Sequence, residues 1–189
     1  MISVIIPTKD RSDHLEKVLP SYLAQAGVLE IIIVDDSAKE THRSAIRQIA
    51  QGNPKIFLIQ DGKGSGLPAA RNKGIRASGG KLVFFGEDDL ELAPGHLEVL
   101  LAHLEKRRAD IMGGRKIWKG EGESNAKALS KAKDCKDPVW DPFYLECCSH
   151  ASPPADLPAP LLLAHFLARR EVFAKAMFEE EYQGFRRGF

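Results

Sequence analysis

The chain has 189 residues, of which 43% are hydrophobic and 28% are charged, and its formal net charge is +1. This length is enough for one domain with a real core. Because the charges nearly cancel, there is no overall electrostatic attraction to nucleic acid or to an anionic membrane surface, and we expect no nucleic acid as a partner. The sequence also contains no apolar stretch long enough to span a bilayer.

The N-terminus and the cysteines bear on the cellular compartment. Residues 1–7 carry neither a basic leader nor a small-residue cleavage site, so we expect a first strand there and no signal peptide. The three cysteines, Cys135, Cys147 and Cys148, make an odd number and form no disulfide framework. The sequence therefore predicts a cytoplasmic protein.

Short apolar runs and amphipathic segments alternate along the first 114 residues. Residues 2–7 are a β-branched run that predicts a strand, and apolar residues at helical spacing follow, in a helix that Pro20 should kink or split. Further strands are expected at 29–34, 55–60, 81–85 and 110–114. Further helices are expected at 40–51, 67–77 and 94–107. This order predicts βαβ crossovers, and hence an α/β fold with a mostly parallel central sheet.

The second part of the chain is less regular. Residues 119–160 are polar and become rich in proline, which predicts a long loop region. An apolar run returns at 161–167, and 169–178 has a helical pattern. We expect one domain overall, with a first half at 1–114 and a second half at 115–189.

Polar side chains gather where three of the predicted strands end. The clusters are residues 8–11, 35–37 and 87–89. In open sheets of this kind, ligands bind beyond the carboxyl ends of the strands. We therefore expect the three clusters to converge at one edge of the sheet, although they are far apart in the sequence.

The adjacent acids Asp88 and Asp89 are the strongest sign of a ligand at that edge. Neighbouring carboxylates repel each other, and a hard divalent ion would hold them together. Mg²⁺ or Mn²⁺ typically binds one or two carboxylates together with substrate phosphates. A solvated turn is the alternative for the isolated pair, but convergence with the other clusters favours a metal–phosphate site.

The glycine-rich turn at 62–66 allows a different interpretation. Gly64, Gly66 and Ala69 fit the G-x-G-x-x-G/A fingerprint of dinucleotide-binding proteins, with acids at a suitable distance downstream. However, this is the third turn between a strand and a helix, whereas the fingerprint usually opens the fold. A dinucleotide-dependent oxidoreductase is therefore an alternative, and a flexible loop before the helix is the simpler interpretation of the glycines.

Four segments together resemble family 2 glycosyltransferases with the GT-A fold. They are VIIPTKDR at 4–11, IIVDDS at 32–37, GLPAARNKG at 66–74 and FFGEDD at 84–89. The resemblance covers 1–114 well. It implies an inverting transfer of a sugar, in polysaccharide biosynthesis, from a nucleotide-diphosphate donor to a carbohydrate or lipid-linked acceptor. Residues 1–114 would be the nucleotide-sugar-binding half and 115–189 the acceptor-side half.

The resemblance also implies which residues bind the nucleotide. Pro7 and Thr8 would line the nucleotide pocket. Asp36 would bond the edge of the base, with Asp35 as its neighbour. Arg71 would contact the nucleotide, as a guanidinium near the start of a helix can reach phosphate or base.

The metal site would be a DXD-type element at 87–89. Asp89 would be the direct ligand of Mn²⁺ or Mg²⁺, and Asp88 would touch the ribose or the metal. Glu87 stands where the family usually has an aspartate.

The general base is the part of the site that the resemblance places least well. In relatives it is a carboxylate in an acidic cluster that follows a glycine–aromatic turn, and residues 177–185 resemble the stretch before it. We expect that cluster beyond Phe189, in which case the sequence is truncated. Glu180 and Glu181 are the candidates within the chain. A domain that binds a nucleotide sugar without turnover is thus a further alternative.

Overall fold

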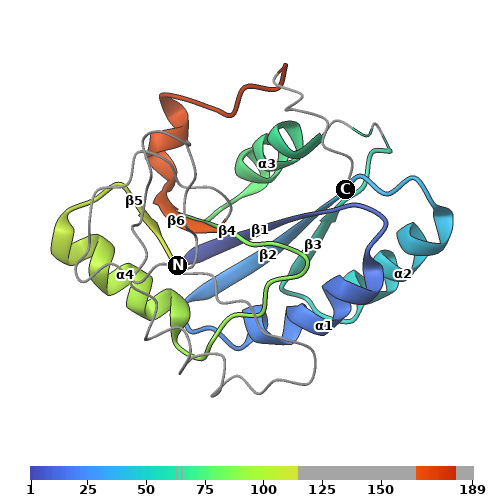
Figure 1. Cartoon of the computed structure of the whole chain (residues 1–189), viewed down its shortest axis with the longest axis horizontal. Helices are drawn as coiled ribbons and strands as arrows, with labels where there is room; N and C mark the ends of the chain where they lie inside the picture. Colours follow the sequence, from blue (N-terminus) through green and yellow to red (C-terminus); the bar gives the residue numbers. More distant parts are fainter. Residues whose placement is uncertain (63, 65, 115–164, 182–189) are drawn as a thin grey trace, which may run out of the picture. The chain divides into compact units, whose positions relative to one another are not determined.

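The computed structural model describes residues 1–62, 64, 66–114 and 165–181 (Figure 1). The chain divides into two compact units, one made of Met1–Met112 with Ala164–Phe189 and the other of Gly113–Leu163. The first unit therefore contains residues from both predicted halves of the chain. The boundary at residue 114 stays a prediction, and the loop predicted at 119–160 lies outside the described residues.

A six-stranded sheet forms the centre of the first unit (Figure 1). Its order is β3-β2-β1-β4-β6-β5. The strands are β1 (Ile2–Thr8), β2 (Val28–Asp35), β3 (Ile56–Ile59), β4 (Leu82–Phe85), β5 (Ile111–Gly113) and β6 (Phe166–Arg169). β1 pairs in parallel with β2 and β4, and β2 pairs in parallel with β3, whereas β6 is antiparallel to β4. The predicted α/β fold with a mostly parallel sheet is confirmed.

Helices cover both faces of this sheet. α3 (Gly66–Ala77) lies on one face, and α1 (Ser12–Leu23), α2 (Glu40–Gln51) and α4 (His96–Arg107) lie on the other (Figure 1). Alternate residues of β1 serve the two faces, as expected for a strand. Val4 and Ile6 join the core with α1, α2 and α4, whereas the Ile5 side chain contacts Gly74 of α3, where an added Cβ would clash with it. Within the described ranges, no helix has the length and apolar character needed to cross a membrane.

Helix α1 is not split at Pro20, one of the two outcomes expected from the sequence. The proline neither ends the helix nor divides it. Pro20 lies in the last turn, where its carbonyl still accepts a hydrogen bond from the Ala24 N–H at 3.0 Å. A proline this close to a helix end removes one donor and leaves most of the hydrogen bonds of the helix in place.

The prediction of a helix at 169–178 is wrong. Arg169 is the last residue of β6, and a short 3₁₀ helix, η1 (Arg170–Ala174), follows it. The Arg169 N–H donates to the Asp110 carbonyl at 2.9 Å, and the Arg170 N–H donates to the Lys81 carbonyl at 3.0 Å. Pairing with distant segments thus overrides the local helical pattern. Most of the apolar run at 161–167 lies outside the described residues.

Candidate functional site

The ends of three strands bring the polar clusters together. The parallel register of β1 and β4 pairs Ile5 with Phe85, so Asp88 comes level with Thr8. The Thr8 hydroxyl donates to Asp88 Oδ2 at 2.8 Å. The Asp36 N–H donates to the carbonyl of Thr8 at 3.0 Å. The predicted convergence of the clusters at one edge of the sheet is therefore confirmed.

Arg11 bridges the two adjacent acids, Asp88 and Asp89, which we call the tandem acids. Its Nη1 lies 3.0 Å from Asp88 Oδ1, and its Nη2 lies 2.9 Å from Asp89 Oδ2. The side chains of Asp89 and Arg11 are 40% and 41% exposed, whereas that of Asp88 is 9% exposed. One guanidinium thus holds two carboxylates that would otherwise repel each other. A merely solvated turn does not fit Asp88, because its carboxylate is buried and bonded on both oxygens.

The electrostatics of this pair depend on burial as well as charge. Burial raises the pKa of the Asp88 carboxyl, and the Thr8 hydroxyl and the Arg11 guanidinium only partly offset that rise. Burial also lowers the pKa of Arg11, but the hydrogen bond to Asp89 and the charge of Asp88 more than compensate, and the net shift is upward. The anionic form of Asp88 therefore gains from any positive charge beside it.

The tandem acids fit a divalent ion that takes its other ligands from a substrate. Among the described residues, no group of three or more histidine, cysteine, aspartate or glutamate side chains could hold a metal ion. Two adjacent carboxylates that already share one cation match the small protein contribution of a typical Mg²⁺ site, which substrate phosphates and water complete. A phosphorylated ligand would therefore add donors to those of the two acids and of water, and strengthen metal binding here.

Asp35 is fully engaged by the protein itself. Its Oδ1 accepts the Ser37 N–H at 2.8 Å, and its Oδ2 accepts the Gln60 side-chain amide at 2.6 Å. The residue is buried. Asp35 therefore stabilises the turn after β2 through hydrogen bonds within the protein.

Asp36 has a different environment. Its Oδ2 accepts the Gly66 N–H at the start of α3 at 3.1 Å. Its Oδ1 is buried, lies 3.9 Å from Lys73 Nζ, and accepts no hydrogen bond from the described part of the chain. Lys73 makes a closer ion pair with Asp61, at 2.8 Å. Asp36 thus has one oxygen that accepts no hydrogen bond from the described residues, whereas each oxygen of Asp35 accepts one.

Arg71 is packed between aromatic rings. Its guanidinium carbon lies 5.5 Å from the ring centre of Phe85 and 5.2 Å from that of Phe178. Burial lowers the pKa of Arg71, and the charge of Glu87 opposes that shift. The side chain is therefore a buried cation with cation–π support, and its contact with a nucleotide stays a prediction.

Asn72 fastens a distant segment to α3. Its side-chain amide donates to the Phe178 carbonyl at 2.8 Å and accepts the Phe178 N–H at 3.0 Å. It also donates to Glu180 Oε1 at 2.8 Å, and Arg76 reaches the same oxygen at 3.2 Å. The hydrogen bond from Asn72 and then that from Arg76 lower the pKa of Glu180. Glu180 is thus a paired carboxylate and Glu181 an exposed one, and the choice of either as general base stays a prediction.

Tyr22 holds the turn that leads to the tandem acids. Its hydroxyl donates to the Glu87 carbonyl at 3.0 Å and accepts the Glu87 N–H at 3.1 Å. An added Cβ on Gly86 would come within 2.8 Å of the Tyr22 ring, so a glycine is needed for this approach. The sequence indicates Tyr22 only as an apolar position of a helix. Nothing in the local pattern predicts this contact, since the partners lie 65 residues apart.

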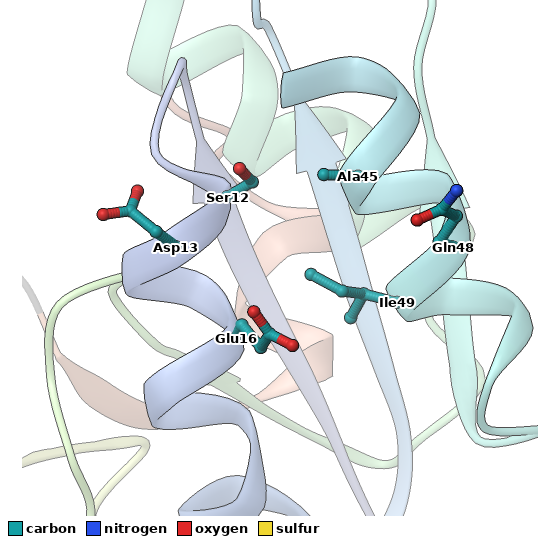
Figure 2. A pocket seen from close by; sticks show the side chains of 6 residues that line it. All are labelled: Ser12, Asp13, Glu16, Ala45, Gln48 and Ile49. Carbon is teal, nitrogen blue, oxygen red and sulfur yellow. The ribbon is translucent and has the colours of Figure 1, made fainter. Parts of the chain in front are cut away.

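A surface groove lies between α1 and α2, apart from these clusters (Figure 2). Side chains from the two helices line it: Ser12, Asp13, Glu16, Ala45, Gln48 and Ile49. The Ser12 hydroxyl is 2.8 Å from His42 Nδ1, a contact that joins the start of α1 to α2. None of the strand-end acids lines this groove, so we assign it no part in the site.

Comparison with known proteins identifies the class of the chain. Residues 3–149 match the family model described as Glycosyl transferase family 2. A curated relative from Campylobacter jejuni, the GalNAc(5)-diNAcBac-PP-undecaprenol beta-1,3-glucosyltransferase, is 34% identical over 137 residues. These cover 69% of this chain and 44% of that protein.

Two solved structures are similar in fold. The mannosyltransferase PcManGT from Pyrobaculum calidifontis, in complex with GDP-Man and Mn²⁺, is 16% identical with a TM-score of 0.65, over 95% of this chain and 48% of its own. S. aureus TarS 1-349, in complex with UDP-GlcNAc, is 21% identical with a TM-score of 0.52, over 65% of this chain and 36% of its own. The chain spans less than half the length of each of these three proteins.

Proposed function

The chain belongs to glycosyltransferase family 2 and has the GT-A fold, and we propose that it forms the donor side of an inverting, metal-dependent glycosyltransferase. The donor would be a nucleotide-diphosphate sugar. The observation that carries this proposal is the meeting of Thr8, Asp36 and the pair Asp88–Asp89 at the ends of parallel strands, in a chain of this family. Membership of the family removes the case for a dinucleotide-dependent oxidoreductase.

Asp36 is the proposed contact to the base of the nucleotide. Its buried Oδ1 can accept an N–H of the base, while Gly66 and Lys73 hold the carboxylate in place. Pro7 and Thr8 would line the same pocket, because they end β1 beside the turn after β2. Asp35 would act by supporting that turn, and Arg71 would add positive charge near the nucleotide.

Asp89, together with Asp88, is the proposed ligand of Mn²⁺ or Mg²⁺. Asp89 is the more exposed of the two, so it can reach an ion that also binds the donor diphosphate. The P. calidifontis protein of the same fold was solved with GDP-Man and Mn²⁺. When bound, the ion would stabilise the negative charge that develops on the leaving nucleotide diphosphate.

The acceptor hydroxyl would attack the anomeric carbon on the side opposite the leaving group, which inverts the configuration. A general base must take its proton. We place that base on a carboxylate other than Glu180, because Asn72 and Arg76 already bind Glu180. The C. jejuni relative is named for GalNAc(5)-diNAcBac-PP-undecaprenol, and we propose a carbohydrate or lipid-linked acceptor in polysaccharide biosynthesis.

A domain that binds a nucleotide sugar without transferring it is the second candidate. The engagement of Glu180 by Asn72 and Arg76 favours it, since one of the two candidate bases within the chain is then occupied. Mn²⁺-dependent hydrolysis or transfer from a nucleotide sugar would support the enzyme. Tight metal-dependent binding with neither reaction would support the binding domain.

Calorimetry with UDP and GDP, with and without Mn²⁺, tests the donor site. We expect one of the two nucleotides to bind in a Mn²⁺-dependent way, and Asp89→Ala to abolish the dependence. Glu91→Ala is the matched control, because it removes an exposed acid two residues away. The proposal is wrong if neither nucleotide binds, or if Asp89→Ala leaves the Mn²⁺ dependence intact.

A further inference from the structure

Arg11 occupies the carboxylates that the proposed function gives to a divalent ion. The guanidinium makes one contact to each acid, at 3.0 Å to Asp88 and 2.9 Å to Asp89. The contact to Asp89 is also a hydrogen bond. This two-point contact joins each carboxylate through a separate guanidinium nitrogen, and both contacts are charge-assisted.

We propose that Arg11 is a competing cation, which holds Asp88 and Asp89 until a divalent ion displaces it. The metal ion and the guanidinium are thus alternative occupants of one pair of acids. This inference rests on the proposed function, since it concerns the same two carboxylates.

Electrostatics makes simultaneous occupation unfavourable. The pair supplies a charge of −2, whereas an arginine and a divalent ion together bring +3 to the same two carboxylates. Arginine stays protonated at any ordinary pH, so the conflict cannot be relieved by loss of a proton. The guanidinium must therefore move away when the ion binds.

The surroundings allow that movement while they keep one acid fixed. The Arg11 side chain is partly exposed, so it can turn into solvent. Asp88 keeps its orientation during the exchange, because the Thr8 hydroxyl holds its other oxygen at 2.8 Å. Tyr22 holds the preceding backbone at Glu87. The exchange thus involves one flexible side chain, Arg11, beside one acid that stays in place, Asp88.

The exchange also links metal binding to donor binding. A displaced guanidinium stays on the loop after β1 and is well suited to phosphate oxygens. A donor diphosphate can therefore accept Arg11 while the ion takes the acids. We expect Arg11 to increase the coupling between metal and nucleotide, although it weakens the binding of metal alone.

Titration of the chain with Mn²⁺ alone tests the competition. The free ion is followed by its electron paramagnetic resonance signal, which falls as Mn²⁺ binds. We expect Arg11→Met to bind Mn²⁺ about tenfold more tightly than the wild type, since two charge-assisted contacts no longer oppose the ion. Arg11→Lys, which retains the charge but loses the two-point contact, should be intermediate.

Lys9→Met is the matched control for net charge. Lys9 is exposed on the same loop, so its loss removes the same charge without touching the acids, and it should change Mn²⁺ affinity far less. Equal effects of Arg11→Met and Lys9→Met would overturn the competition and leave the metal site standing. Absence of Mn²⁺ binding in every variant, with and without UDP or GDP, would instead reject the metal site and the competition together.

Discussion

Two histidines from distant parts of the chain, His96 and His165, lie close enough to interact. His96 begins α4, and its ring meets that of Phe84 edge-on, with centroids 6.2 Å apart. Burial lowers the pKa of His96, and the nearby His165 lowers it further. His96 is therefore neutral in the folded protein at pH values where the unfolded chain already binds a proton.

This difference makes the stability of the fold depend on pH. The unfolded state takes up a proton at His96 as the pH falls through about 6.5, and the folded state does so only at lower pH. The contribution of neutral His96 to stability is therefore present in full above about pH 7. It is lost progressively as the pH falls below the pKa of His96 in the unfolded chain. Urea unfolding at several pH values measures this effect. As the pH falls, the free energy of unfolding should decrease less for His96→Gln than for the wild type.

His14→Gln is the control for this experiment, because His14 lies on the surface with a side chain that is 47% exposed. Its loss should leave the pH dependence of unfolding close to that of the wild type. Equal slopes for His96→Gln and the wild type would show that the neutral state of His96 does not contribute.

The sequence predicts the site at the level of residues only in part. The acids after the strands stand out, since polar residues directly follow buried runs. The sequence does not show, however, which group each carboxylate oxygen binds. Asp35 and Asp36 are neighbours of one chemical type, yet Gln60 engages the first and Gly66 the second. These partners come from other loops, so only the folded backbone distinguishes a supporting acid from one that is open to a ligand.

At the scale of elements, the Asn72 side chain makes the hydrogen bonds that hold the backbone around Phe178 against α3. Its amide makes both hydrogen bonds to the Phe178 backbone, as a paired strand would. The Phe178 ring in turn packs on Arg71 and Phe85. Asn72 thus supplies the hydrogen bonds to the Phe178 backbone, while the contacts of the Phe178 ring add to them.

Asn72→Ala should release that segment. The change leaves a part-buried N–H and a part-buried carbonyl of Phe178 without these partners, which costs up to about 1–3 kcal/mol. Hydrogen exchange should show lower protection of the Phe178 amide, with little change in β1. Arg76→Ala is the control, because it removes only the exposed contact to Glu180, for which about 0–1 kcal/mol is typical. Equal protection in both variants would contradict the role of Asn72.

The elements themselves are predicted best where local and long-range preferences agree. The strands β1, β2 and β4 are apolar runs that are mostly buried, and helices α2 and α3 have clear boundaries. The prediction is wrong at 169–178, where β6 and η1 take the place of a helix. Antiparallel pairing of β6 with β4 joins segments that lie about 80 residues apart, and helical spacing carries no information about such a partner.

At the scale of the whole molecule, the site joins parts of the chain that fold as one unit. β1, β2 and β4 are neighbours in the sheet, and their polar ends are also bonded to one another. α3 adds Gly66 and Lys73 to the same edge. A ligand that bridges these ends would therefore stabilise the first unit as a whole rather than one loop.

Ligand-induced stabilisation measures this coupling directly. A ligand at 100 times its Kd stabilises the state that binds it by about 2.7 kcal/mol. For a chain of this size, that corresponds to a rise in Tm of roughly 5–10 °C. We expect this rise with Mn²⁺ and the preferred nucleotide, UDP or GDP, when added together, and a smaller one with either alone.

Asp36→Ala should remove most of this rise, since it takes away the proposed contact to the base without touching the tandem acids. Asp13→Ala is the matched control, because Asp13 is an exposed acid at the start of α1, with a side chain that is 63% exposed. Its Tm should rise as in the wild type. An Asp36→Ala variant that keeps the full rise would mean that the nucleotide binds elsewhere, and that the meeting of the strand ends serves the fold alone.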